Sequence, residues 1–288
     1  MTVLEVIQRS TDFLARKDLD SPRLQVELLL AHVLHLPRLK LYLSFDRVLT
    51  EQELDVLRKL IKRRADHEPL QYILGSTCFC GLEMIVTREV LIPRPETELL
   101  AERAWECLHR LTSEGTAHPA VLDFGTGSGC LAVTLAVKCP ETRIYALDIS
   151  EGALHVARQN AQRHQAGERI RFYPGKDFAA LPGDVRFDLL VSNPPYIPSA
   201  QVETLQPEVR DYEPRVALDG GQDGLTTFRF LATQAPAVMA PGGYAILEFG
   251  DGQADAVREI FQQQGWIVER VQEDYSGRPR ILIAYRPK

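Results

Sequence analysis

After Pro119, short β-prone runs alternate with stretches in which apolar residues recur at helical spacing. The β-prone runs cover residues 121–124, 143–148, 170–173, 187–192 and 244–249. The helical stretches lie between or after them, at residues 128–138, 150–164, 224–239 and 253–264. Alternation of this kind builds a mostly parallel sheet with helices on both faces. The sequence therefore predicts a doubly wound α/β domain.

Two further strand-like runs follow, at residues 266–273 and 280–286. Only the turn Ser276-Gly277-Arg278-Pro279 stands out between them. Parallel neighbours need a long crossover connection, whereas antiparallel strands can be joined by a tight turn. These two runs are therefore predicted to pair as an antiparallel hairpin.

The first 70 residues carry helix signals instead. Val3, Val6, Ile7 and Leu14 recur at helical spacing, and Ser21-Pro22 predicts an N-cap serine followed by proline at the first helical position. A further helix is indicated by a capping box, in which Thr50 is followed three residues later by Glu53 and then by apolar residues at helical spacing. These signals predict a helical domain.

Between the two regions the pattern changes to short β-prone pieces, residues 72–74 and 84–86, around Gly75 and Gly81. Such pieces predict a hairpin. Pro93 and Pro95 then force extended backbone before an acid-rich helix start. The expected organisation is a helical domain over residues 1–70, a β-hairpin linker over 71–91 and the α/β domain over 92–288.

Several classes of protein are disfavoured by composition. The apolar run Leu28–Leu36 is far shorter than the ~20 residues that cross a bilayer, and the N-terminal residues show no secretory signal, so a cytoplasmic protein without a membrane segment is expected. The five cysteines are scattered without paired metal-ligand spacing, and no HExxH pair occurs. We therefore expect no protein-bound catalytic metal and an organic cofactor.

The overall charge argues against a nucleic-acid substrate. The formal net charge is −6 and the sequence pI is about 5.7. A protein dedicated to duplex DNA would usually present a basic face. Direct nucleic-acid recognition is therefore not expected.

A glycine-rich turn, Asp123-Phe124-Gly125-Thr126-Gly127-Ser128-Gly129, follows the first strand and opens a helix. In this context a glycine loop lets a nucleotide-like ligand approach the backbone closely. A dinucleotide fingerprint would have glycine where Cys130 stands, and no P-loop lysine follows. The G-x-G-x-G form favours S-adenosylmethionine over NAD or ATP.

Two carboxylates accompany this turn. Asp148 ends the next strand, 19 residues after Gly129, in the position from which such acids accept hydrogen bonds from ribose hydroxyls. Asp123 ends the first strand, where ligands of doubly wound sheets collect. It either orients the methionine part of the cofactor or caps the turn.

The strand at 187–192 runs directly into Asn193-Pro194-Pro195-Tyr196. Successive prolines have fixed φ and donate no backbone hydrogen bonds, so their carbonyls and the Asn193 side chain are rigid acceptors for a planar amino group. Asn193 and the Pro194 carbonyl are expected to accept the two N–H bonds, with Tyr196 packed against the amide plane. Adenine, cytosine and glutamine all carry such a group.

Four stretches together are similar to one known family: Glu68–Gly75, Leu91–Glu98, the glycine turn and Val191–Ile197. On these stretches, and over nearly the whole chain, the sequence resembles the release factor glutamine methyltransferases, the HemK/PrmC family. The resemblance implies a class I, Rossmann-like, seven-stranded S-adenosylmethionine-dependent methyltransferase domain, preceded by a five-helix domain and a β-hairpin linker.

The same resemblance implies the reaction and its residues. The methyl group would go to the side-chain amide nitrogen (N5) of the glutamine in the Gly-Gly-Gln motif of class I peptide chain release factors, which the helical domain would help to recognise. The implied glutamine-binding residues are Asn193, Pro194, Pro195 and Tyr196. The implied cofactor contacts are Gly125, Thr126, Gly127, Ser128, Gly129, Asp148 and Asn193.

One segment departs from the family pattern. Where the family often shows an acid, then Trp or Leu, then Phe near the adenine, this chain has Lys176-Asp177-Phe178. Asp177 is a candidate polar contact to adenine, and Phe178 either lines the ring or belongs to the core. Two alternatives to the family reaction stay open: an amino-methyltransferase acting on adenine in DNA or RNA, and a non-catalytic cofactor-binding interaction module.

Overall fold

The computed structural model describes residues 1–287, which form two compact units. One unit comprises Met1–Gly75 together with the later segment Gln206–Tyr212. The other comprises Ser76–Leu205 and the chain from Glu213 onward. The chain therefore leaves the second unit once, for seven residues, and then returns to it.

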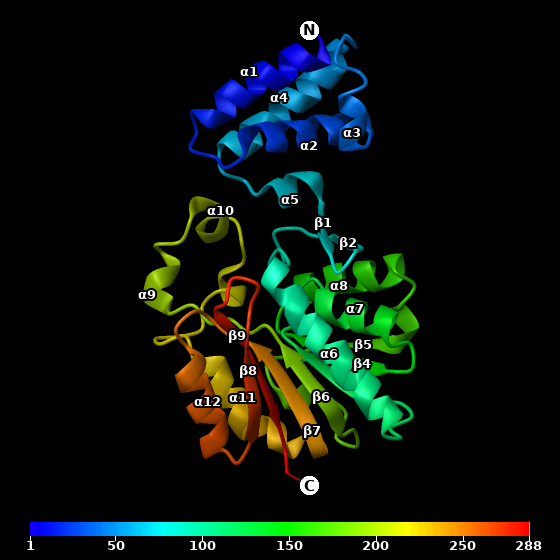
Figure 1. Cartoon of the computed structure of the whole chain (residues 1–288), viewed down its shortest axis with the longest axis vertical. Coiled ribbons are helices and arrows are strands. Elements are labelled where there is room, and N and C mark those ends of the chain that lie inside the picture. The colour runs from blue at the N-terminus through cyan, green and yellow to red at the C-terminus, as the bar shows by residue number, and fades with distance from the viewer. Residues whose placement is uncertain (288) are drawn as a thin grey trace. The chain divides into compact units, whose positions relative to one another are not determined.

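The first unit is helical (Figure 1). Its helices are α1 (Val3–Ala15), α2 (Pro22–Leu34), α3 (Arg38–Leu41), α4 (Glu51–Ala65) and α5 (Leu70–Leu74). The capping box predicted at Thr50 and Glu53 is confirmed at the start of α4, and Thr2 with Glu5 forms a second one at the start of α1. The apolar faces of these helices pack into one core, which includes Val3, Leu14, Leu29, Leu30 and Leu57.

One local prediction in this unit was confirmed in part and another was wrong. Ser21 is the N-cap residue and Pro22 the first helical residue, as predicted, but the Ser21 side chain makes no capping hydrogen bond, and its φ of 47° is in the left-handed region. Residues 72–74 form part of α5 rather than a strand, because Pro69 and Gly75, the latter at φ 79°, bracket a single helical turn whose Ile73 joins the helical core. The β-hairpin begins just after this turn.

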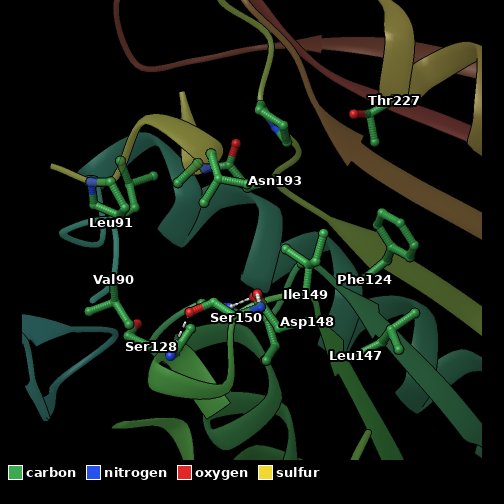
Figure 2. A pocket seen from close by; sticks show the side chains of 18 of the residues that line it. Val90, Leu91, Phe124, Ser128, Leu147, Asp148, Ile149, Ser150, Asn193 and Thr227 are labelled. Carbon is green, nitrogen blue, oxygen red and sulfur yellow. Dashed lines mark hydrogen bonds between the residues drawn. The ribbon is translucent and has the colours of Figure 1, made fainter. Parts of the chain in front are cut away.

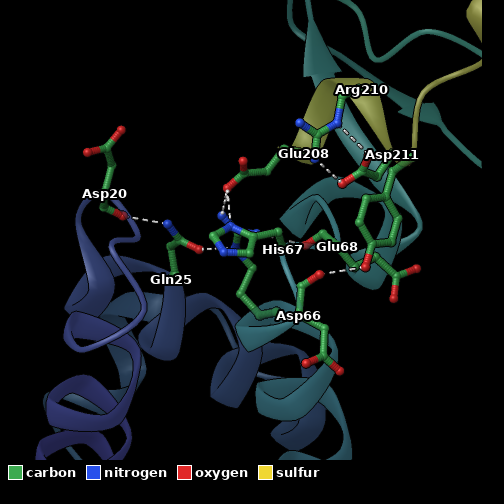
Figure 3. Close-up of polar contacts among 10 residues, drawn as sticks. Asp20, Gln25, Asp66, His67, Glu68, Glu208, Arg210 and Asp211 are labelled. Carbon is green, nitrogen blue, oxygen red and sulfur yellow. Dashed lines mark hydrogen bonds and ion pairs between the residues drawn. The ribbon is translucent and has the colours of Figure 1, made fainter. Parts of the chain in front are cut away.

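The segment Gln206–Tyr212 contains the short helix α10 (Pro207–Arg210) and is held to the first unit by polar contacts (Figure 3). The buried Arg64 guanidinium donates to Glu208 Oε1 at 2.8 Å and to the Glu68 carbonyl at 3.0 Å. The Tyr212 hydroxyl donates to the Asp66 carbonyl at 2.6 Å. Charge pairing at a buried arginine therefore fixes this later segment on the end of α4.

Arg64→Ala should lower the free energy of unfolding of the first unit by about 1.5–3 kcal/mol, since it removes a buried guanidinium that donates to the partly exposed Glu208 and to the Glu68 carbonyl. Hydrogen exchange should show loss of amide protection in residues 206–212. Arg58→Ala is the matched control, because Arg58 pairs with Asp55 on the exposed surface and such pairs contribute about 1 kcal/mol or less. Equal thermal unfolding of the two variants would contradict this account.

The second unit begins with an antiparallel hairpin of β1 (Ser76–Phe79) and β2 (Leu82–Ile85). Its seven-stranded sheet has the order β5-β4-β3-β6-β7-β9-β8. The first five strands in that order are parallel, and β9 is antiparallel to both of its neighbours. The strands are β3 (Ala120–Phe124), β4 (Arg143–Asp148), β5 (Ile170–Pro174), β6 (Phe187–Ser192), β7 (Met239–Glu248), β8 (Ile267–Glu273) and β9 (Pro279–Tyr285).

Helices cover both faces of this sheet, as the alternation predicted (Figure 1). Helices α6 (Pro95–Ser113), α7 (Cys130–Lys138) and α8 (Glu151–Arg163) pack on one face. Helices α11 (Thr226–Gln234) and α12 (Ala254–Gln263) pack on the other. Neighbours along a strand divide between the two cores: Val121 belongs to the first and Leu122 to the second. The predicted class I methyltransferase fold, with its antiparallel last hairpin, is confirmed.

The remaining elements are short: helix α9 (Ser199–Val202) and four 3₁₀ turns at Gly167–Arg169, Phe178–Ala180, Arg215–Ala217 and Ala235–Ala237. Within residues 1–287, no helix is both long enough and apolar enough to cross a membrane. Nor does that part of the chain gather three or more histidine, cysteine or acidic side chains into a group that could hold a metal ion.

Candidate active site

The carboxyl ends of β3, β4 and β6 open onto one cavity of about 360 Å³ (Figure 2). Ligands of doubly wound sheets bind at this edge, where the strand order reverses. Phe124, Asp148 and Asn193 come from the three strand ends and lie around this cavity. Its other lining residues include Glu89, Val90, Leu91, Pro93, Thr97, Gly125, Thr126, Gly127, Ser128, Ile149, Ser150, Gly175, Lys176, Pro195, Pro214, Val216, Thr226, Thr227 and Phe230.

Glycine is required at three positions of the turn, for two different reasons. All three have positive φ: 72° at Gly125, 54° at Gly127 and 77° at Gly129. A Cβ at Gly125 or Gly127 would meet nothing within 4 Å, and both residues line the cavity, so a side chain there would occupy ligand space. A Cβ at Gly129 would lie 3.0 Å from the Ala157 Cβ, so Gly129 permits close packing of α7 on α8.

Asp123 lies behind the turn and is fully buried. Its Oδ2 accepts hydrogen bonds from the Thr126 hydroxyl at 2.6 Å and from the Ala132 amide at 3.1 Å. Burial raises the pKa of this carboxyl to about 7, while those hydrogen bonds act in the opposite direction. Since Asp123 does not line the cavity, its visible role is to cap the turn and the start of α7; its Oδ1 is buried without a partner.

Asp148 lines the cavity and also braces the turn. Its Oδ2 accepts from the Gly127 amide at 2.8 Å, and its Oδ1 accepts from the Ser150 amide at 2.8 Å. Burial raises the pKa of Asp148 from its ordinary value. Ser150 caps α8 by accepting from the Ala153 amide. Each oxygen of Asp148 keeps a second lone pair with which it can accept a hydroxyl of a ligand.

An aromatic wall closes the cavity on the side of α11. Phe124 and Phe230 line it, with ring centroids 5.7 Å apart. Phe178 packs behind both, at 5.6 Å from Phe124 and 5.2 Å from Phe230, and does not line the cavity. Asp177 also lies outside the lining and caps a 3₁₀ turn by accepting from the Ala179 amide at 3.1 Å. From this segment Gly175 and Lys176 reach the cavity instead.

The Asn193–Tyr196 motif follows β6 along the same edge. Asn193 and Pro195 line the cavity, whereas Pro194 and Tyr196 do not. The backbone here is held from outside the motif: Gln253 Nε2 donates to the Tyr196 carbonyl at 2.9 Å, and Gln253 Oε1 accepts from the Gly250 amide at 2.8 Å. The motif is therefore a rigid segment beside the glycine turn.

Several residues at this site were not among the sequence candidates: Gly175, Lys176 and Phe230 of the cavity lining, and also Thr97 and Glu248. Thr97 of α6 accepts a hydrogen bond from Asn193 Nδ2 at 3.0 Å and donates one to Glu248 Oε2 at 2.7 Å. Glu248, at the end of β7, is buried, and burial raises the pKa of its carboxyl to about 7. The available signal was an acid directly after the apolar run 245–247 of a predicted strand.

Comparisons with known proteins agree with this fold. Residues 5–75 match the family model described as the PrmC N-terminal domain, and residues 106–208 match the methyltransferase small domain. Among solved structures, a methyltransferase from Pyrococcus furiosus superposes with a TM-score of 0.52 at 19% identity, covering 73% of this chain and 91% of that one. That likeness supports the fold.

Whole-chain relatives are much closer in sequence. The release factor glutamine methyltransferase of Geobacter sulfurreducens is 46% identical over 281 residues, which cover 98% of this chain and 95% of the relative. That of Chlorobaculum tepidum is 44% identical over 284 residues, covering 98% and 96%. Both comparisons span the helical unit, the hairpin and the sheet together. The chain therefore belongs to the release factor glutamine methyltransferase family.

Proposed function

We propose that this protein transfers a methyl group from S-adenosylmethionine to the side-chain amide nitrogen of the glutamine in the Gly-Gly-Gln motif of class I peptide chain release factors. One observation carries the proposal: the glycine turn lines the same cavity as Asn193 and Pro195 of the Asn193–Tyr196 motif, in a chain of this family. A site for a nucleoside-like cofactor therefore lies next to acceptors that can bind a planar amino group.

The cavity fits the cofactor on several sides. Gly125 and Gly127 leave space where side chains would stand, and Asp148 can accept ribose hydroxyls. Phe124 and Phe230 offer an aromatic wall for a base. When bound, S-adenosylmethionine supplies a methyl group on a positively charged sulfur. We assign the adenine contact to this wall and to Gly175 and Lys176, rather than to Asp177 or Phe178.

The chain's contribution to catalysis is alignment. The lone pair of an amide nitrogen is delocalised, so the nitrogen attacks only weakly and must be held in line with the methyl group. Asn193 Oδ1, at the cavity, would accept one of its N–H bonds. The Pro194 carbonyl would accept the other, with Tyr196 beside the amide plane; both belong to the same motif but lie outside the cavity lining. Near-attack geometry of this kind can lower a barrier by roughly 7–11 kcal/mol.

The same acceptors also stabilise the charge that develops during methyl transfer. Positive charge develops on the amide nitrogen as it takes the methyl group, and fixed acceptors stabilise that charge without reorganising. The extra proton then leaves to water, so no dedicated general base is required. The helical unit, which matches the PrmC N-terminal domain, is proposed to help recognise the release factor.

Methyl transfer to three substrates tests the proposal. Purified protein with methyl-labelled S-adenosylmethionine should label a class I release factor. It should not label the same factor with its Gly-Gly-Gln glutamine replaced, nor duplex DNA, since the net charge of −6 disfavours nucleic acid. Label on DNA would support the adenine reaction, and cofactor binding without any transfer would support an interaction module.

A further inference from the structure

The Glu248 carboxylate is buried at the end of β7, where it contacts Tyr196 directly and is linked to Asn193 through Thr97. Its Oε2 accepts from the Thr97 hydroxyl at 2.7 Å, and Thr97 in turn contacts Asn193. Its Oε1 accepts from the Tyr196 hydroxyl at 3.5 Å, the long end of hydrogen-bond range. The Glu248 carboxylate therefore interacts with Tyr196 directly and with Asn193 through Thr97.

The direction of these hydrogen bonds decides which way the Asn193 amide faces. An asparagine side chain has an oxygen and a nitrogen of similar size, and only its partners distinguish them. A hydroxyl has one hydrogen, and that of Thr97 is given to Glu248. The Thr97 oxygen can therefore only accept, so Asn193 must turn its Nδ2 toward Thr97, at 3.0 Å. Its Oδ1 is left for the cavity that Asn193 lines.

We propose that Glu248 and Thr97 are positioning residues that hold the Asn193 amide with its oxygen toward the substrate amino group. This inference rests on the proposed function. A substrate amide presents N–H donors, so only the oxygen of Asn193 can grip it. With the Asn193 amide reversed, its N–H group would face an N–H group of the substrate, and the two donors would repel each other.

The charge of Glu248 sets the direction of the whole chain of hydrogen bonds. As a carboxylate it only accepts; once protonated it can donate to Thr97, whose hydrogen is then free to turn toward Asn193 Oδ1. Burial raises the pKa of Glu248 to about 7, with Glu96 on α6 acting in the same direction. Arg280 on β9 and the hydrogen bonds from Thr97 and Tyr196 oppose this. Protonation below pH ~7 should therefore reverse Asn193.

Thr97→Val and Thr97→Ser form a matched pair for this proposal. Valine keeps the shape and removes the hydroxyl, so kcat for release-factor methylation should fall about 100-fold, the effect typical of a misplaced group. Serine keeps the hydroxyl, so kcat should stay within about threefold of the wild-type value. The Kd for S-adenosylmethionine, measured by calorimetry, should be unchanged in both. Near-wild-type kcat in Thr97→Val, or equal losses in both variants, would overturn the proposal.

The pH dependence of kcat provides a second, independent test. Wild-type kcat at saturating cofactor should fall as pH decreases through about 7, and Glu248→Gln should lack this acidic limb because its amide does not titrate there. Burial also raises the pKa of Asp123, to about 7, and that of Asp148, and Glu248→Gln leaves both carboxyls intact. An unchanged acidic limb in Glu248→Gln would therefore assign the limb to a carboxyl other than Glu248 and overturn the proposal. Wild-type protein inactive on the release factor would instead refute the proposed function.

Discussion

Replacing Asn193 by alanine should lower kcat for methyl transfer roughly 10²- to 10³-fold, the usual cost of removing one fixed group that stabilises developing charge. Loss of the Asn193 side chain should open no gap in the core, because the side chain lines the cavity and, within residues 1–287, donates only to Thr97. The thermal unfolding temperature should therefore change little. Because Asn193 is also an expected cofactor contact, kcat is compared at saturating S-adenosylmethionine. Single-turnover rates with a release factor, measured beside calorimetry, separate these quantities.

Gln222→Ala is a suitable control for that experiment. Gln222 is exposed, lies outside the cavity lining and follows two glycines in an internal Gly-Gly-Gln sequence. A Cβ at Gly220 would meet the Pro195 carbonyl at 2.7 Å, so that glycine is explained by packing against the motif. Activity should be normal in Gln222→Ala. Near-normal kcat in Asn193→Ala would mean that Asn193 does not hold the substrate amide as proposed.

The second large effect is expected at the cofactor. Asp148→Ala should weaken binding of S-adenosylmethionine about 100-fold or more, since each hydrogen bond to a charged group contributes about 1.5–3 kcal/mol and the brace on Gly127 is lost as well. Because the chemistry itself does not involve Asp148, kcat should largely recover at saturating cofactor. Calorimetric titration and kcat at increasing cofactor concentration measure the two effects.

Asp188→Ala is a matched control, because Asp188 lies at the opposite, amino-terminal end of the parallel strands. It lies near the start of β6, where its Oδ2 accepts from the Ala120 amide at 2.8 Å, away from the cavity lining. Asp188→Ala should leave cofactor affinity unchanged. If both aspartate variants bind the cofactor as the wild-type protein does, the assignment of Asp148 to the cofactor fails.

The parts of the fold that depend on local sequence were predictable. The glycine turn, the capping box at Thr50 and the strand–helix alternation follow from backbone requirements of neighbouring residues, and the structure has all three. Residues 72–74 were misassigned, because a short apolar run suits a strand or a helical turn equally. Only the flanking Pro69 and Gly75 distinguish the two.

Features that join distant parts of the chain could not be predicted in this way. Thr97, Asn193 and Glu248 come from α6, the end of β6 and the end of β7, and no spacing rule brings them together. The same holds for Glu208 and Arg64, which lie 144 residues apart in the chain. Phe178 was expected either to line the adenine ring or to belong to the core; it packs against Phe124 and Phe230, which line the cavity where Phe178 does not.

The most direct test of the central claim is to map the methyl group on a class I release factor after reaction with the purified protein and S-adenosylmethionine. Fragmentation mass spectrometry of the peptide containing Gly-Gly-Gln should find one added methyl group on the glutamine side chain. The peptide from a reaction with Asn193→Ala should be unmodified. A methyl group on any other residue, or an unmodified peptide with the wild-type protein, would contradict the account.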